Sequence, residues 1–134
     1  MRACLALALW ALLPAAATAA VPLQALGEGD VGAEALENSA CYAHDGPAVL
    51  VVATRKNAVV NSEGDLLLLE RLGDDGAPGG GARYGSDRFE VVIAPSPGPA
   101  GPKASDGRTH QPARISVRTG KNVSNGTVRW ACGS

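Results

Sequence analysis

The chain has 134 residues, and its 12 basic and 13 acidic side chains give a formal net charge of −1 at pH 7. A chain of this length forms one compact domain rather than two. Aromatic residues make up only 4% of it, which is too few for a surface on which nucleic-acid bases stack. We therefore expect no nucleic-acid partner.

The first 20 residues have the pattern of a signal peptide. Arg2 precedes an apolar run over residues 3–13, Pro14 ends that run, and the small residues 15–20 provide a cleavage site. The apolar run is shorter than the roughly 20 residues that span a bilayer, and no later segment approaches that length. We expect an exported protein, periplasmic or secreted, with no membrane span in the mature chain.

Residues 21–38 are predicted to be an acidic, flexible lead-in to the domain. The segment contains four acidic residues with three glycines between them. Because glycine weakens helices, this composition does not favour a stable helix. A single β domain is expected over residues 39–134.

From residue 39 onward, short runs of Val, Ile and Leu alternate with turn residues, which is typical of an antiparallel all-β domain. The predicted strands cover residues 39–43, 48–54, 57–61, 65–72, 88–94, 113–118 and 127–132. Turn residues between the first four strands predict a meander of hairpins, and Asn125-Gly126 is the predicted turn of the last hairpin. The expected fold is a small antiparallel β-barrel or β-sandwich with one disulfide.

Side-chain alternation assigns the faces of these strands. It places Trp130 and Cys132 on an inner face, with the charged residues of the last two strands on the outer face. The four leucines at 66–69 do not alternate with polar residues, so this strand is predicted to be covered on both sides.

The cysteines indicate a structural disulfide. Cys4 lies in the predicted signal peptide, which leaves Cys41 and Cys132 as the one possible pair in an oxidising compartment. The pair should join the first strand to the last. We therefore assign these cysteines neither a redox nor a metal-binding role.

Two loops are expected to be mobile connectors on the surface, at residues 73–81 and 95–107. Both are rich in glycine or proline and poor in apolar residues that could fix their shape. Loops of this kind are also where a binding site can lie.

Charge is unevenly distributed along the chain. Residues 21–102 hold twelve acids and five bases, a balance of −7, whereas residues 103–134 hold six bases and one acid, a balance of +5. If Arg114, Arg118 and Arg129 share the outer face of the last hairpin, they form a basic stripe that suits carboxylates or phosphates. The alternative is that neighbouring acidic strands neutralise this stripe.

No catalytic or metal-binding motif is present in the sequence. His44 and His110 lack the spacing of a zinc motif, and no serine lies in a nucleophile pattern. We expect no metal, no cofactor and no enzymatic activity. A small hydrolase is a third alternative only because four carboxylates could approach one another: Glu63, Asp65, Glu70 and Glu90.

About half of the mature sequence resembles a known family. The pattern consists of Cys41, Asp45-Gly46, a valine-rich strand, Ala58-Val59-Val60, Gly64, residues 67–70 and Gly80-Gly81-Ala82-Arg83-Tyr84. It resembles the periplasmic and membrane-bound inhibitors of C-type lysozyme. The resemblance implies an exported antiparallel β-barrel without enzymatic activity.

The resemblance also implies an inhibitory loop. Gly81 and Tyr84 match the glycine and tyrosine of that loop, and Gly80 stands where the family has a serine. The family's lysine has no counterpart between Ser86 and Ala94.

Two functional hypotheses follow from these patterns. The first is a non-enzymatic binding module that inhibits C-type lysozyme through a loop with Gly81, Arg83 and Tyr84. The second is a structural or envelope-interaction protein that binds an anionic envelope component through its basic hairpin, formed by Arg114, Arg118 and Arg129.

Overall fold

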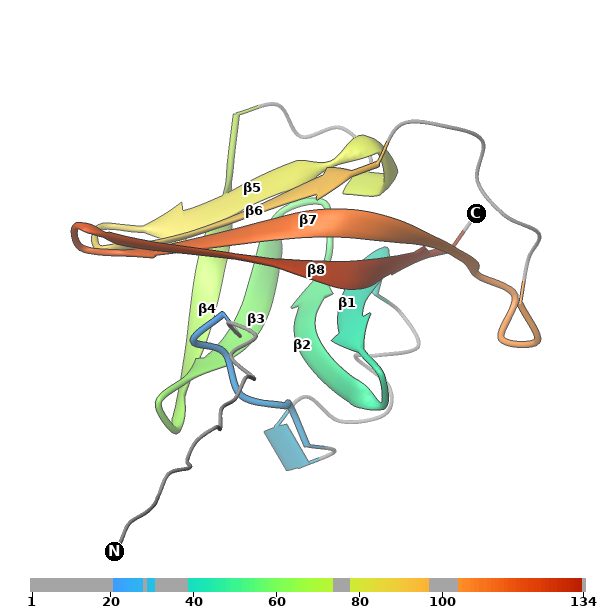
Figure 1. The fold of residues 1–134 in the computed structure, drawn as a ribbon, viewed down its shortest axis with the longest axis horizontal. Coiled ribbons are helices and arrows are strands. Elements are labelled where there is room, and N and C mark those ends of the chain that lie inside the picture. Colours follow the sequence, from blue (N-terminus) through green and yellow to red (C-terminus); the bar gives the residue numbers. More distant parts are fainter. Residues whose placement is uncertain (1–20, 28, 31–38, 74–77, 97–103, 134) are drawn as a thin grey trace, which may run out of the picture.

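The protein is an eight-stranded antiparallel barrel. The computed structural model describes residues 21–27, 29–30, 39–73, 78–96 and 104–133. Each strand pairs with its neighbours in the sequence, and β1 pairs with β8 to close the barrel (Figure 1). The elements are β1 Cys41–Asp45, β2 Ala48–Ala53, β3 Asn57–Ser62, β4 Asp65–Leu72, the 3₁₀ turn η1 Pro78–Gly80, β5 Ala82–Ser86, β6 Phe89–Pro95, β7 Thr109–Thr119 and β8 Asn122–Cys132.

The closed barrel confirms the predicted fold class and excludes the sandwich alternative. All seven predicted strands are present, and the meander over β1 to β4 turns where the sequence predicts. Within the described residues, no helix is long and apolar enough to cross a membrane. The predicted signal peptide lies outside the described residues.

One strand was absent from the sequence prediction. Residues 82–86, predicted to belong to a loop region, form β5, which pairs with β4 on one side and β6 on the other. Without this strand the barrel would be open between β4 and β6. The loop assignment of residues 82–84 is therefore wrong.

The last hairpin is longer than predicted, and its turn lies elsewhere. The strands reverse at Gly120 and Lys121, where Gly120 has a φ of 63°. Asn125-Gly126 instead lies within β8, and Gly126 pairs with Ile115. A Cβ at Gly126 would lie 3.3 Å from Val21 Cγ1, so the glycine leaves space for that side chain.

Strand β4 is covered on one face and not on both. Leu69 is fully buried, whereas Leu66 and Leu68 are 46% and 66% exposed. The prediction of two covered faces is therefore wrong: these leucines alternate across the barrel wall as in any strand with one solvent-facing side.

The two ends of the barrel are filled by segments predicted to be flexible. At one end the Trp130 indole donates a hydrogen bond of 3.0 Å to the Pro78 carbonyl oxygen, which places η1 over the core. At the other end Val21 and Leu23 are buried in the core. Backbone hydrogen bonds join Gln24 to Asn61 and Leu26 to Val49.

These contacts correct the predictions for part of each segment. Residues 21–26 belong to the domain rather than to a flexible lead-in, because their apolar side chains complete the core. Residues 78–80 are likewise held in place. Residues 28, 31–38, 74–77 and 97–103 lie outside the described residues.

The predicted disulfide is present between Cys41 and Cys132. The two cysteines are direct partners in the pairing of β1 with β8, with their Cα atoms 4.1 Å apart. Cys132 is partly buried and packs against the core cluster that contains Trp130. The bridge therefore fastens the seam at which the first strand meets the last.

Candidate functional site

Tyr84, predicted to belong to a binding loop, is a core residue. It lies in β5 with 0% of its surface exposed. Its hydroxyl group donates a 2.8 Å hydrogen bond to the Thr54 carbonyl oxygen across the barrel, and burial raises the pKa of the phenol. Tyr84 presents no surface to a partner, so its assignment to a binding loop is wrong.

The fold also requires a glycine at position 81. Its φ is 118°, a conformation that side chains disfavour. A Cβ there would lie 3.0 Å from the Ile93 carbonyl oxygen and 3.2 Å from Pro95 Cδ. The glycine lets the start of β5 approach β6 closely.

Arg83 is the exposed member of the predicted loop set, and it belongs to an ion-pair network. Its guanidinium lies 2.7 Å from Glu90 on β6, and Arg118 on β7 lies 2.8 Å from the other oxygen of the same carboxylate. Hydrogen bonds from Arg118, and then from Arg83, lower the pKa of Glu90. One glutamate thus links three adjacent strands.

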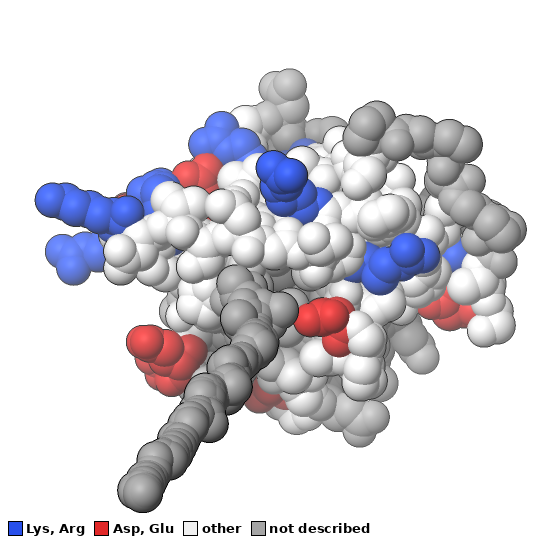
Figure 2. All heavy atoms as spheres, in the orientation of Figure 1, with Lys and Arg blue, Asp and Glu red and all other residues white. Residues whose placement is uncertain are grey.

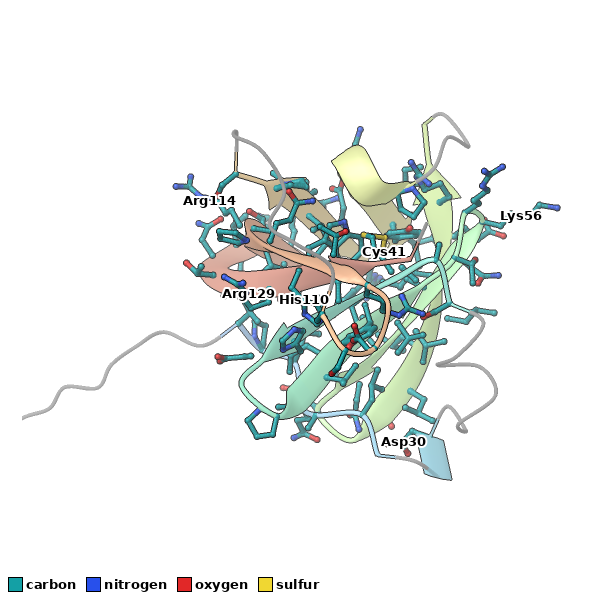
Figure 3. All side chains as sticks on the ribbon, turned by 90° about the vertical axis from the view of Figure 1, so that its right-hand side faces the viewer. Asp30, Cys41, Lys56, His110, Arg114 and Arg129 are labelled. Carbon is teal, nitrogen blue, oxygen red and sulfur yellow. A yellow bond between two sulfur atoms is a disulfide. The ribbon has the colours of Figure 1, made fainter. Side chains whose placement is uncertain are left out.

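The basic stripe predicted on the last hairpin is present. Arg114 and Arg118 lie on the outer side of β7, Arg129 lies on the outer side of β8, and all three are exposed. Figure 2 shows blue side chains along the face formed by β7 and β8, and Figure 3 shows Arg114 and Arg129 projecting away from the barrel. We call the outward side of β5 to β8 the basic face; its arginines are Arg83, Arg114, Arg118 and Arg129.

The charges on the basic face are only partly compensated. Within these four strands Glu90 is the one acidic side chain, and it is shared by Arg83 and Arg118. Arg114 and Arg129 form no ion pair with any residue that the structure describes. Its four arginines and one glutamate give this face a net charge of +3.

A second polar cluster borders the basic face where β1, β8 and β7 meet. His44 Nε2 lies 3.1 Å from His110 Nδ1, and His110 Nε2 lies 3.0 Å from Asp106 Oδ2. Tyr42 donates a 3.1 Å hydrogen bond to the same carboxylate. We call Tyr42, His44, Asp106, Arg108 and His110 the histidine cluster.

The position of the histidine cluster follows from strand register. Tyr42 on β1 and His110 on β7 both pair with Ala131, the residue between them on β8. His44 is the next outward residue on β1 and pairs with Arg129. Sequence reasoning missed this cluster because His44 and His110 are 66 residues apart.

Asp106 is the centre of the hydrogen bonds in this cluster. The backbone N–H of Arg108 donates to it over 2.9 Å, and this bond is the largest cause of the lowered pKa of Asp106. The Arg108 guanidinium lies 5.1 Å from the centre of the Tyr42 ring and donates to the Ser39 carbonyl oxygen. These contacts fix the segment before β7 against the barrel wall.

The four carboxylates of the hydrolase alternative lie at or near the surface of the barrel. Glu63, Asp65 and Glu70 are exposed, Glu90 is held by its two arginines, and none of the four is buried. No group of three or more His, Cys, Asp or Glu side chains among the described residues has the arrangement of a metal site. The four carboxylates that the hydrolase alternative requires are therefore not buried together.

An open cleft lies at the end of the barrel beside β8. Its volume is about 510 Å³. The side chains of Val21, Leu50, Ile115 and Val128 make much of its wall apolar, and Asp45 contributes a carboxylate. Among the described residues that line the cleft, Asp45 is the one charged side chain.

Comparison of the chain with protein-family models, with curated proteins and with solved structures finds no match. The basic face and the histidine cluster are therefore the two surfaces that bear on function.

Proposed function

We propose that this protein is an exported, non-enzymatic binding module that engages an anionic partner through the basic face. The observation that supports this proposal is that Arg114 and Arg129 project from the paired strands β7 and β8 and form no ion pair with a described residue. Guanidinium groups form planar, paired hydrogen bonds with carboxylates and phosphates. An anionic envelope component is the partner that this surface suits.

The backbone geometry favours recognition of an extended partner. β7 and β8 are each 11 residues long and are paired along their whole length. Arg114 pairs with Thr127, and Arg129 pairs with Pro112, so the two arginines are diagonal neighbours across the ribbon. Arg118 extends the row toward the tip of the hairpin, which allows successive charges of a polymer to be contacted.

The test is binding of the purified protein to an anionic polysaccharide and, separately, to phosphatidylglycerol vesicles. The variant Arg114→Glu/Arg129→Glu should lose at least about tenfold in affinity at low salt, because two attractive contacts become repulsive. Added salt should weaken binding by the wild type. The two ligands distinguish a polymer from a lipid surface as the anionic partner.

The control is Arg55→Glu/Lys56→Glu, which changes the net charge equally at two exposed residues of the β2–β3 turn. This variant should bind nearly as well as the wild type. Equal losses in the two variants would show that net charge alone is responsible, and binding that is insensitive to salt would also refute the proposal.

Inhibition of C-type lysozyme is the second candidate. It is supported by the closed antiparallel barrel, which is the fold that the family resemblance implies. Tyr84 and Gly81 serve the fold, so Arg83 is the residue of the predicted loop set with an exposed side chain.

A lysozyme activity assay tests this candidate. Micromolar protein should slow cell-wall lysis by a C-type lysozyme, and Arg83→Ala should weaken that inhibition. Full lysozyme activity in the presence of the wild-type protein would exclude the inhibitor function and leave the anion-binding proposal unaffected.

A further inference from the structure

The facing nitrogens of His44 and His110 have an unusual hydrogen-bond arrangement. His44 Nδ1 lies 3.0 Å from the Gly46 carbonyl oxygen, which can only accept a hydrogen bond. His110 Nε2 lies 3.0 Å from the Asp106 carboxylate, which also accepts. In each neutral ring the proton therefore belongs on the nitrogen that points away from the other histidine.

This assignment leaves a lone pair on each of the two inner nitrogens. His44 Nε2 and His110 Nδ1 are 3.1 Å apart, and in neutral imidazoles both are acceptors. Two acceptors at this distance repel each other unless an electropositive species lies between them. A metal cation or a shared proton can fill that role.

We propose that His44 and His110 form a binding site for a late first-row divalent transition-metal ion, with Cu²⁺ bound more tightly than Zn²⁺. Neutral imidazole suits these ions, and the preference follows their general order of affinity. The site has two protein ligands and is completed by water, so it is smaller than a metal site with three or more protein ligands.

The nitrogen separation fits chelation of one ion. With metal–nitrogen bonds of about 2.0–2.1 Å, nitrogens 3.1 Å apart subtend about 95–100° at the metal. This angle lies between the 90° of a square-planar site and the tetrahedral angle of about 109°. The two rings must turn so that their lone pairs converge on the ion, and both side chains are only partly buried.

The surrounding residues resemble the outer shell of known metal sites. Ligating histidines commonly donate their second N–H to a carboxylate or a backbone carbonyl, and His110 and His44 make one contact of each kind. Tyr42 and the backbone N–H of Arg108 in turn hold the Asp106 carboxylate. The negative charge of Asp106 also favours a bound cation.

The test is calorimetric titration of the purified protein with Zn²⁺ and with Cu²⁺. The wild type should bind one ion at a site that is absent from His44→Gln/His110→Gln. Each single variant should lose at least about tenfold in affinity and bind as weakly as the double variant, because chelation requires both rings. Asp106→Asn should lose about tenfold or more through loss of the outer contact.

The matched control is Asp45→Asn, which removes an exposed carboxylate adjacent to His44 that bonds to neither ring. It should bind both ions within about twofold of the wild type. Circular dichroism and unfolding midpoints should show that the histidine variants remain folded.

Two results would overturn the inference. If the wild type bound neither ion more tightly than the double variant, the two rings would share only a proton. If the single variants each kept a substantial part of the affinity, the histidines would act separately. Neither outcome depends on whether the basic face binds an anionic partner.

Discussion

At the scale of single residues, the motif that resembles a binding loop consists of side chains that stabilise the barrel. Gly81 allows a close approach between β5 and β6, Tyr84 fills the core, and Arg83 bonds to Glu90. Each residue type has a physical reason that involves no partner. Similarity in such a motif is therefore evidence about the fold before it is evidence about inhibition.

The ion pairs of Glu90 should make the stability of the protein depend on pH. Two arginines lower its pKa below the ordinary value of 4.5, so the folded state favours its charged form. Its contribution to stability is therefore fully present above that ordinary pKa and is lost as the pH falls through the lower pKa of the folded state. Glu90→Gln should lower the free energy of unfolding by about 1 kcal/mol at neutral pH, since both arginines are about half exposed.

Urea unfolding of the wild type and of Glu90→Gln, from about pH 7 down to about pH 2, measures this effect. The difference between the two proteins should shrink toward zero at the acidic end. Glu70→Gln is the control, because Glu70 is exposed and forms no ion pair with a described residue. A difference for Glu90→Gln that stayed constant with pH would refute the assignment.

At the scale of elements, the strands in which apolar and polar residues alternate could be predicted from the sequence. The run from Phe89 to Ile93 buries every second residue, as its sequence indicates. β5 was missed because Tyr84 is its one large apolar residue and Gly81 and Gly85 interrupt the pattern. The small Gly85 is nevertheless required, since a Cβ there would lie 3.0 Å from the Phe89 carbonyl oxygen.

Tertiary packing also overrode a local turn signal. Asn125-Gly126 suits a hairpin turn, but Gly126 lies within β8 beside Val21. The chain turns instead at Gly120, which has the positive φ that a tight hairpin turn requires. A contact with the N-terminal segment is not readable from the hairpin sequence alone.

The basic face could be predicted from local sequence, whereas the histidine cluster could not. Arg114, Arg118 and Arg129 belong to a single hairpin, so alternation within that hairpin was enough to predict a shared face. The histidine cluster depends on the closure of the barrel, which brings β1 and β7 to opposite edges of β8. Its distances follow from long-range register, which local patterns do not contain.

At the scale of the whole molecule, closure depends on a short seam between distant parts of the chain. β1 and β8 pair over four residues, whereas β7 and β8 pair over eleven. Bringing the first strand to the last costs loop-closure entropy, which neighbouring hairpins largely avoid. The Cys41–Cys132 bridge removes much of that cost by keeping these ends together in the unfolded chain.

The Cys41–Cys132 bridge should account for a large share of the free energy of unfolding. For a sequence separation of 91 residues, the chain-entropy relation gives a stabilisation of about 4.6 kcal/mol. Cys41→Ala/Cys132→Ala should therefore lower the free energy of unfolding by about 4–5 kcal/mol in denaturant titrations. A reductant should destabilise the wild type and leave the variant unchanged. A loss below about 1 kcal/mol would mean that strand pairing and the filled barrel ends close the barrel without the bridge.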